Sequence, residues 1–226
     1  MKTSTTSWWP STSWMPARPD RTVVVVGTGT DVGKTWVTAA LARRLVTSGL
    51  RVAARKPAQS FAPVDPVEGR DAAVLAAATG EAPDAVCPPH RSYEVPLAPP
   101  MAAAVLGRPA VVLEDLLAEL TWPADCQVGF VETVGGVRSP ISDDADGVAL
   151  IEALAPDLVL LVADAGLGTL NLVRLTMAAL AGWPTITILN RYNGASALHR
   201  DNRAWLEERD GLDVVTTVGV LAARLS

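Results

Sequence analysis

No apolar run in this 226-residue chain approaches the roughly 18 uninterrupted residues that a membrane span needs, although 49% of the residues are hydrophobic. Lysine and arginine form no basic cluster, and the formal net charge is −5, so a nucleic acid is not an expected partner. The chain also lacks internal repeats, and its length suits one domain with a full core. We therefore expect a cytoplasmic protein with neither a membrane nor a nucleic-acid partner.

Cysteine and histidine are scarce. The only cysteines, Cys87 and Cys126, lie far apart without metal-ligand spacing, which favours free thiols in a reducing compartment. The two histidines, His90 and His199, are isolated from any nucleophile or metal-binding set. These absences argue against a structural zinc site and against histidine-based nucleophilic catalysis.

The first twenty residues are rich in Ser, Thr, Pro and Trp and lack the apolar region of a signal peptide. We predict a disordered extension over residues 1–20, with Met15 as an alternative start of the chain. The folded domain is then expected to cover residues 21–226.

Short apolar runs alternate with helical patterns along that domain. The expected strands cover residues 22–26, 51–55, 128–131, 157–162, 185–189 and 214–218. The expected helices cover residues 34–48, 72–78, 112–120, 147–154, 170–181 and 196–208. This alternation predicts an α/β fold, a P-loop NTPase-like three-layer sandwich with a mostly parallel central sheet. The proline-rich stretch 82–100 is expected to be a long excursion over the surface.

The strongest motif is the stretch Gly-Thr-Gly-Thr-Asp-Val-Gly-Lys-Thr at 27–35, between the first strand and the first helix. Five residues separate Gly27 from Gly33 where the usual phosphate loop has four, so the loop is a variant. Its chemistry is preserved, because backbone N–H groups and a helix N-terminus favour phosphate, Lys34 can reach the β- and γ-phosphates, and the Thr35 hydroxyl can bind Mg²⁺. The predicted nucleotide-binding residues here are Thr30, Asp31, Val32, Gly33, Lys34 and Thr35.

The form Gly-Thr-x-Thr-x-Val-Gly-Lys-Thr resembles the dethiobiotin synthetase family and the related cobyrinate amide ligases. Those amide ligases need a glutaminase domain, for which this chain has no room. Partition and septum-site ATPases of the same superfamily carry a lysine where this chain has Gly29. The resemblance therefore points to the dethiobiotin synthetases.

A second motif, Lys-Pro-Ala-Gln-Ser at 56–60, follows the second expected strand and resembles the family's Lys-Pro-x-x-Ser-Gly. The resemblance implies that Lys56 contacts the γ-phosphate and the carbamate under attack, and that Ser60 helps to hold the substrate. With Lys34, these are the expected catalytic residues. Phe61 replaces the family's glycine, which allows a closer backbone approach, so the substrate side of this loop departs from the family.

Two acidic residues complete the resemblance. Asp71 begins a helix in a context similar to the family's metal-binding aspartate, and Glu132 ends an apolar strand where a P-loop enzyme places its acidic partner of Mg²⁺. From the residues alone, Asp71 is equally well explained as a helix N-terminal carboxylate. The expected ligands of Mg²⁺ are Thr35, Asp71 and Glu132. Thr133 and Val134 differ from the small residues that the family has after this glutamate.

Two further segments have weaker support. Residues 167–171, Leu-Gly-Thr-Leu-Asn, resemble the family's segment that binds the distal carboxylate of the substrate, partly across a dimer interface. Asn190 corresponds to an asparagine that hydrogen-bonds the adenine edge, but the usual companion aspartate is absent. The resemblance also implies a homodimer.

The activity implied by the resemblance is ATP-dependent closure of the ureido ring of dethiobiotin from 7,8-diaminopelargonate and CO₂. The partners would be ATP, CO₂ and this diamine, with Mg²⁺ as cofactor, and the products dethiobiotin, ADP and phosphate. Two alternatives remain open. One is a MgATP-binding paralogue with an altered substrate, and the other is a switch-type ATPase that binds a protein partner.

Overall fold

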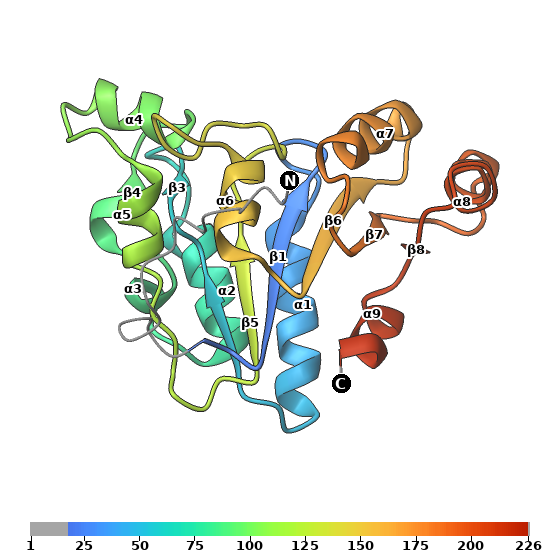
Figure 1. Cartoon of the computed structure of the whole chain (residues 1–226), viewed down its shortest axis with the longest axis horizontal. Coiled ribbons are helices and arrows are strands. Elements are labelled where there is room, and N and C mark those ends of the chain that lie inside the picture. Colours follow the sequence, from blue (N-terminus) through green and yellow to red (C-terminus); the bar gives the residue numbers. More distant parts are fainter. Residues whose placement is uncertain (1–17, 226) are drawn as a thin grey trace, which may run out of the picture.

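The computed structural model describes residues 18–225 (Figure 1). Met15 and most of the expected extension lie outside this range. Its last three residues, 18–20, are held against the sheet. The guanidinium of Arg18 donates to the carbonyl of Ala155 at 2.7 Å, and the backbone N–H of Asp20 donates to Cys126 at 3.1 Å.

The centre of the fold is a six-stranded sheet in the order β2-β5-β1-β6-β7-β8, in which every neighbouring pair is parallel. Its strands are β1 (Arg21–Gly27), β2 (Val52–Arg55), β5 (Val128–Glu132), β6 (Leu158–Asp164), β7 (Thr185–Asn190) and β8 (Val214–Val215). The predicted α/β fold is thereby confirmed. The last strand is shorter than the expected 214–218, because Val218 begins a helix.

Helices cover both faces of the sheet (Figure 1). Val23 and Val25 of β1 point to one core, and Val24 and Val26 point to the other. Their alternation explains why the strand is apolar throughout. The first core packs against α1 (Lys34–Thr47), α2 (Asp71–Thr79), α3 (Pro83–Val86) and α9 (Val218–Leu225). The second packs against α4 (Pro99–Val105), α5 (Leu113–Ala118), α6 (Gly147–Leu154), α7 (Thr169–Ala179) and α8 (Ala197–Glu208).

The stretch 82–100, expected to be a long excursion over the surface, contains short elements of secondary structure. They are α3, a 3-10 turn η2 (Pro89–Arg91), β4 (Ser92–Tyr93) and the start of α4. β4 pairs in parallel with β3 (Gln59–Ser60), and the Tyr93 side chain is buried. The prolines are compatible with these helices because short helices accept proline in their first turn. This lobe lies at the β2 side of the sheet (Figure 1) and is joined to the loop that follows Lys56.

Three of the parallel strands, β2, β5 and β1, lie side by side. Their carboxyl ends therefore open at one edge, where ligands of such sheets bind. Within residues 18–225, no helix is long and apolar enough to cross a membrane.

Candidate active site

The loop between β1 and α1 depends on a glycine at its end. Gly33 has φ +93°, and a β-carbon there would lie 2.1 Å from the side-chain nitrogen of Asn190. That nitrogen, at the end of β7, donates to the carbonyl of Val32 at 2.9 Å. The Nδ2 atom of Asn190 therefore holds the loop in place.

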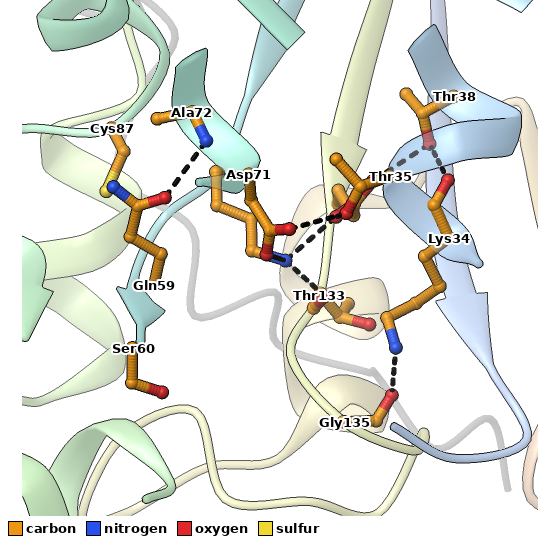
Figure 2. A network of polar contacts seen from close by, with 12 residues as sticks. Lys34, Thr35, Thr38, Gln59, Ser60, Asp71, Ala72, Cys87, Thr133 and Gly135 are labelled. Atoms are coloured by element: carbon orange, nitrogen blue, oxygen red, sulfur yellow. Dashed lines mark hydrogen bonds and ion pairs between the residues drawn. The ribbon is translucent and has the colours of Figure 1, made fainter. Parts of the chain in front are cut away.

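Lys34 is the first residue of α1, and its side chain folds back over the loop. Its Nζ atom donates to the carbonyls of Gly29 at 2.9 Å and Gly135 at 2.7 Å (Figure 2). Burial, together with the nearby charge of Lys56, lowers the pKa of Lys34 to about 8. A bound phosphate group would raise the pKa of Lys34 again, because its negative charge would stabilise the ammonium form.

Lys56 lies between two carboxylates. Its Nζ atom is 2.7 Å from Asp71 Oδ2 and 2.8 Å from Glu132 Oε1, and only 2% of its side chain is exposed. Burial would lower the pKa of Lys56, but the two carboxylates outweigh it and raise the pKa above its ordinary value. Lys34 and Lys56 are two of only three lysines in the chain, whose other basic side chains are arginines. The ammonium of each is a compact point charge on a flexible stem.

Three oxygen atoms converge beside Lys56. The Thr35 hydroxyl lies 2.7 Å from Asp71 Oδ1 and 2.7 Å from Glu132 Oε1. It carries one proton and can donate to only one of these carboxylates at a time. The hydroxyl of Thr38, one turn further along α1, lies 2.9 Å from Glu132 Oε2 and 2.9 Å from the carbonyl of Lys34, and it can donate its one proton to either. Although burial opposes it, Lys56 lowers the pKa of Asp71, so this carboxyl group can serve as an anionic ligand.

These oxygens suit Mg²⁺, which prefers hard oxygen ligands from one or two carboxylates and completes its shell with phosphate and water. No group of three or more His, Cys, Asp or Glu side chains in the described part of the chain has a metal-binding arrangement. The third protein oxygen of the expected set comes instead from Thr35. The residues present therefore fit the ion that the family implies.

A cleft with a volume of about 870 Å³ begins at this cluster. Its near wall is the phosphate loop, with Thr30 and Asp31, and its far wall holds Ser60, Phe61 and residues 96–98. Ser60 lies across the cleft from Lys34 (Figure 2), and its hydroxyl donates to the carbonyl of Leu97 at 2.6 Å. The cleft therefore extends from Lys34, Thr35 and Lys56, which we call its phosphate end, to the wall with Ser60 and Phe61, which we call its organic end.

The residues that depart from the family pattern have different positions. Val134 and Phe61 line the cleft. Thr133 does not, because its side chain is buried and its hydroxyl donates to Val25 in the sheet at 3.3 Å. Residues 167–171 also lie outside the cleft lining, and Leu167 is 91% exposed.

Sequence reasoning missed several contributors to the site. Gln59 accepts from the Ala72 backbone N–H at 2.9 Å and donates to Ser92 at 2.7 Å, which ties the start of α2 to the β3–β4 lobe. Arg191 donates to the carbonyl of Asp31 at 2.8 Å and pairs with Asp164 at 2.9 Å. No local motif announces either residue. Thr38 alone had a signal, since it lies one helical turn after Lys34 on the same face.

A second hollow, of about 610 Å³, adjoins the phosphate loop. It shares Gly33 and Arg191 with the first cleft and is also lined by Asn190 and Trp36. A ligand that lies across Gly33 could therefore occupy both hollows.

Comparison with known proteins agrees with this geometry. A family described as an AAA domain matches residues 21–223. The ATP-dependent dethiobiotin synthetase BioD of Haloferax mediterranei is 37% identical over 198 residues, which are 85% of this chain and 81% of that protein. The chain belongs to the dethiobiotin synthetase family. The synthetases of Methylobacterium nodulans and Caulobacter sp. are each 41% identical, over 66% and 69% of this chain and 70% and 68% of theirs.

Solved structures support the fold. Chloroplast FtsY of Physcomitrella patens aligns with a TM-score of 0.51 at 18% identity, over 93% of this chain and 66% of that structure. The signal recognition particle receptor FtsY of Elizabethkingia anophelis aligns with a TM-score of 0.52 at 16% identity, over 87% of this chain and 58% of that structure. At such identities the likeness concerns the P-loop fold alone.

Proposed function

We propose that this protein, through a single P-loop domain over residues 21–226, closes the ureido ring of dethiobiotin from 7,8-diaminopelargonate, CO₂ and ATP. The observation that carries the proposal is the meeting of Lys34, Lys56 and the three oxygens at the phosphate end of a cleft. Family membership supports the choice of reaction.

The reaction needs positioning more than covalent catalysis. One amine of the substrate adds to CO₂ to form a carbamate, and a carbamate oxygen attacks the γ-phosphorus of ATP and displaces ADP. The second amine then attacks the carbonyl carbon of the mixed anhydride, releases phosphate and closes the ring. Lys34 and Lys56 would offset the charge on the transferred phosphoryl group, and Ser60 would hold the carbamate end of the substrate.

Thr35, Asp71 and Glu132 would hold Mg²⁺, which supplies charge neutralisation to the phosphates when bound. Lys56 pairs with both carboxylates, and its ammonium would offset charge on a phosphoryl group bound beside them. Thr30, Asp31, Val32 and Gly33 would surround the phosphates. Asn190 would accept from the amino group of adenine with Oδ1, because its Nδ2 atom holds Val32.

A cytoplasmic homodimer is part of the proposal. Residues 167–171 lie outside the cleft of their own chain, as they would if they bound the substrate carboxylate of a second copy. Leu167, Leu172 and Leu175 expose large apolar surfaces at this place. Sedimentation equilibrium of the full chain tests the stoichiometry, and a monomer at micromolar concentration would contradict it.

Phosphate release from MgATP and bicarbonate, with and without the diamine, tests the reaction itself. The proposal predicts release that depends on the diamine, with dethiobiotin detected by mass spectrometry. MgATP binding without diamine-dependent release would instead favour a paralogue with another substrate. Slow hydrolysis that no diamine stimulates would favour a switch ATPase.

A further inference from the structure

Arg70 lies over Phe61 in the wall of the cleft. The carbon of its guanidinium is 3.8 Å from the centre of the Phe61 ring, and both residues line the cleft. The ring is 7% exposed, so it forms a fixed surface beneath the guanidinium. A cation stacked on an aromatic face loses little freedom when it binds a ligand, because its orientation is already set.

The charge of Arg70 is not matched by a neighbouring side chain. Its side chain has neither a hydrogen-bond nor an ion-pair partner within residues 18–225, and its buried Nε atom is unsatisfied. The other arginines that approach the interior behave differently. Arg55 pairs with Glu81 at 2.7 Å, and Arg91 pairs with Glu119 at 2.8 Å.

The position of this unpaired cation is informative. Its guanidinium lies on Phe61, in the cleft wall that also holds Ser60, rather than in the phosphate loop. Phe61 stands where the family has a glycine. The residue that departs from the family therefore supports the one arginine of the cleft lining that has no hydrogen-bond or ion-pair partner among residues 18–225.

We propose that Arg70, held on Phe61, binds a carboxylate-type anion of the organic substrate and so contributes to substrate specificity. A guanidinium presents paired N–H groups that match two oxygens in one plane. Such an anion has two sources in this reaction. One is the carbamate formed at the amine, and the other is the terminal carboxylate of the diamine, which Arg70 would then hold in place of residues 167–171 of a second copy. The inference rests on the proposed function and assigns one residue of the same cleft.

Arg70→Ala tests the inference through the KM values for the diamine and for bicarbonate, measured at saturating MgATP. We expect the KM for the diamine to rise on the order of 10-fold or more, since a loss of about 1.4 kcal/mol of binding free energy weakens binding tenfold. Arg70→Lys should recover part of this loss, because it keeps the charge without the planar pair of donors. The Kd for MgATP, measured by calorimetry, should not change.

A diamine of the same chain length without its carboxylate separates the two sources. If Arg70 binds the terminal carboxylate, wild type and Arg70→Ala have the same KM for this compound. If it binds the carbamate, the difference persists and the KM for bicarbonate rises too. Either result supports the inference, and KM values for diamine and bicarbonate within about twofold of wild type would overturn it.

Two variants control for indirect effects. Phe61→Leu keeps Arg70 and removes the aromatic face, so it should raise the same KM by a smaller factor. Arg209→Ala removes an exposed arginine that stacks on Trp205 at 5.9 Å, outside the cleft lining, and should leave KM unchanged. Thermal unfolding of each variant reports folding. Absence of diamine-dependent turnover in the wild type would refute the proposed function. If the wild type is active and Arg70→Ala has the same KM values, only this inference is refuted.

Discussion

The Nζ atom of Lys56 lies 2.8 Å from Oε1 of Glu132, and neither side chain is exposed by more than 2%. The same oxygen is 2.7 Å from the Thr35 hydroxyl, and Lys56 also reaches Asp71. A buried ammonium therefore already offsets part of the negative charge of the two carboxylates that would bind Mg²⁺. The free protein should be stable without the ion, because its acidic ligands have a cation of their own.

Lys56→Met should make the stability of the protein depend on Mg²⁺. The substitution leaves the buried carboxylate of Glu132 and the partly exposed carboxylate of Asp71 without their ammonium partner, and removing one partner of a buried pair costs about 3–5 kcal/mol. Millimolar MgCl₂ should then raise the melting temperature of the variant by several degrees more than that of wild type. Thermal unfolding with and without MgCl₂ measures the difference. Equal shifts in the two proteins would contradict the idea that Lys56 and the ion share these oxygens.

Lys34→Ala should separate function from stability. Turnover should fall on the order of 10²-fold or more, because the proposed function assigns Lys34 to the charge that develops on the phosphoryl group. The free energy of unfolding should fall little, since burial already disfavours the charged form of this lysine. Arg43→Ala, an exposed site on the same helix, is the control and should retain turnover. Near-normal phosphate release by Lys34→Ala would refute its role.

Gly33→Ala and Gly168→Ala form a matched pair. Their φ angles are +93° and +90°, so each alanine incurs the cost of a left-handed backbone, about 1–2 kcal/mol. Only at Gly33 would the new β-carbon collide with a neighbour, 2.1 Å from Asn190. Gly33→Ala should therefore be the less stable variant and should lose MgATP binding, as measured by urea denaturation and calorimetry. Adding Asn190→Ala should recover part of the stability, and no recovery would show that the collision is not the cause.

The parts of the site that sequence could predict are those fixed by local chemistry. The loop ending in Lys34 and Thr35 lies within one strand-loop-helix unit, so its geometry follows from nearby residues. Lys56 and Glu132 follow parallel strands, and carboxyl ends of such strands meet at one edge. Their proximity was therefore predictable once the alternation of strands and helices was recognised.

The features that the sequence did not predict depend on contacts between segments that lie far apart in the chain. Ser60 belongs to the cleft wall because β3 pairs with β4, and the prolines around β4 made that segment look irregular. The chain from Val214 to Val218 is β-branched throughout, yet it changes from strand to helix because Val218 and Leu221 pack in the core that holds α1. A pattern of residue types cannot separate these outcomes, because tertiary packing decides between them.

The lobe that forms the far wall should be sensitive to acid through Glu119. Arg91 donates to both carboxylate oxygens of Glu119, at 2.8 and 2.9 Å, and His90 lies 2.9 Å from one of them. Partial burial would raise the pKa of Glu119, but these hydrogen bonds outweigh it and hold the pKa below its ordinary value of 4.5. A carboxylate with a lowered pKa in the folded state contributes stability that is complete above the ordinary value and is lost as the pH falls through the lowered one.

Glu119→Gln should therefore reduce the free energy of unfolding at neutral pH by on the order of 1 kcal/mol, the scale of a hydrogen bond in a charged pair. The difference from wild type should shrink as the pH falls below 4.5 and vanish once Glu119 is protonated in both states. Urea denaturation at several pH values measures it. Glu94→Gln, which changes an exposed carboxylate in the same lobe, is the control and should follow wild type at each pH. A Glu119→Gln deficit that stayed constant with pH would mean that Glu119 acts through packing, because only the charged form can accept from both Arg91 nitrogens with full strength.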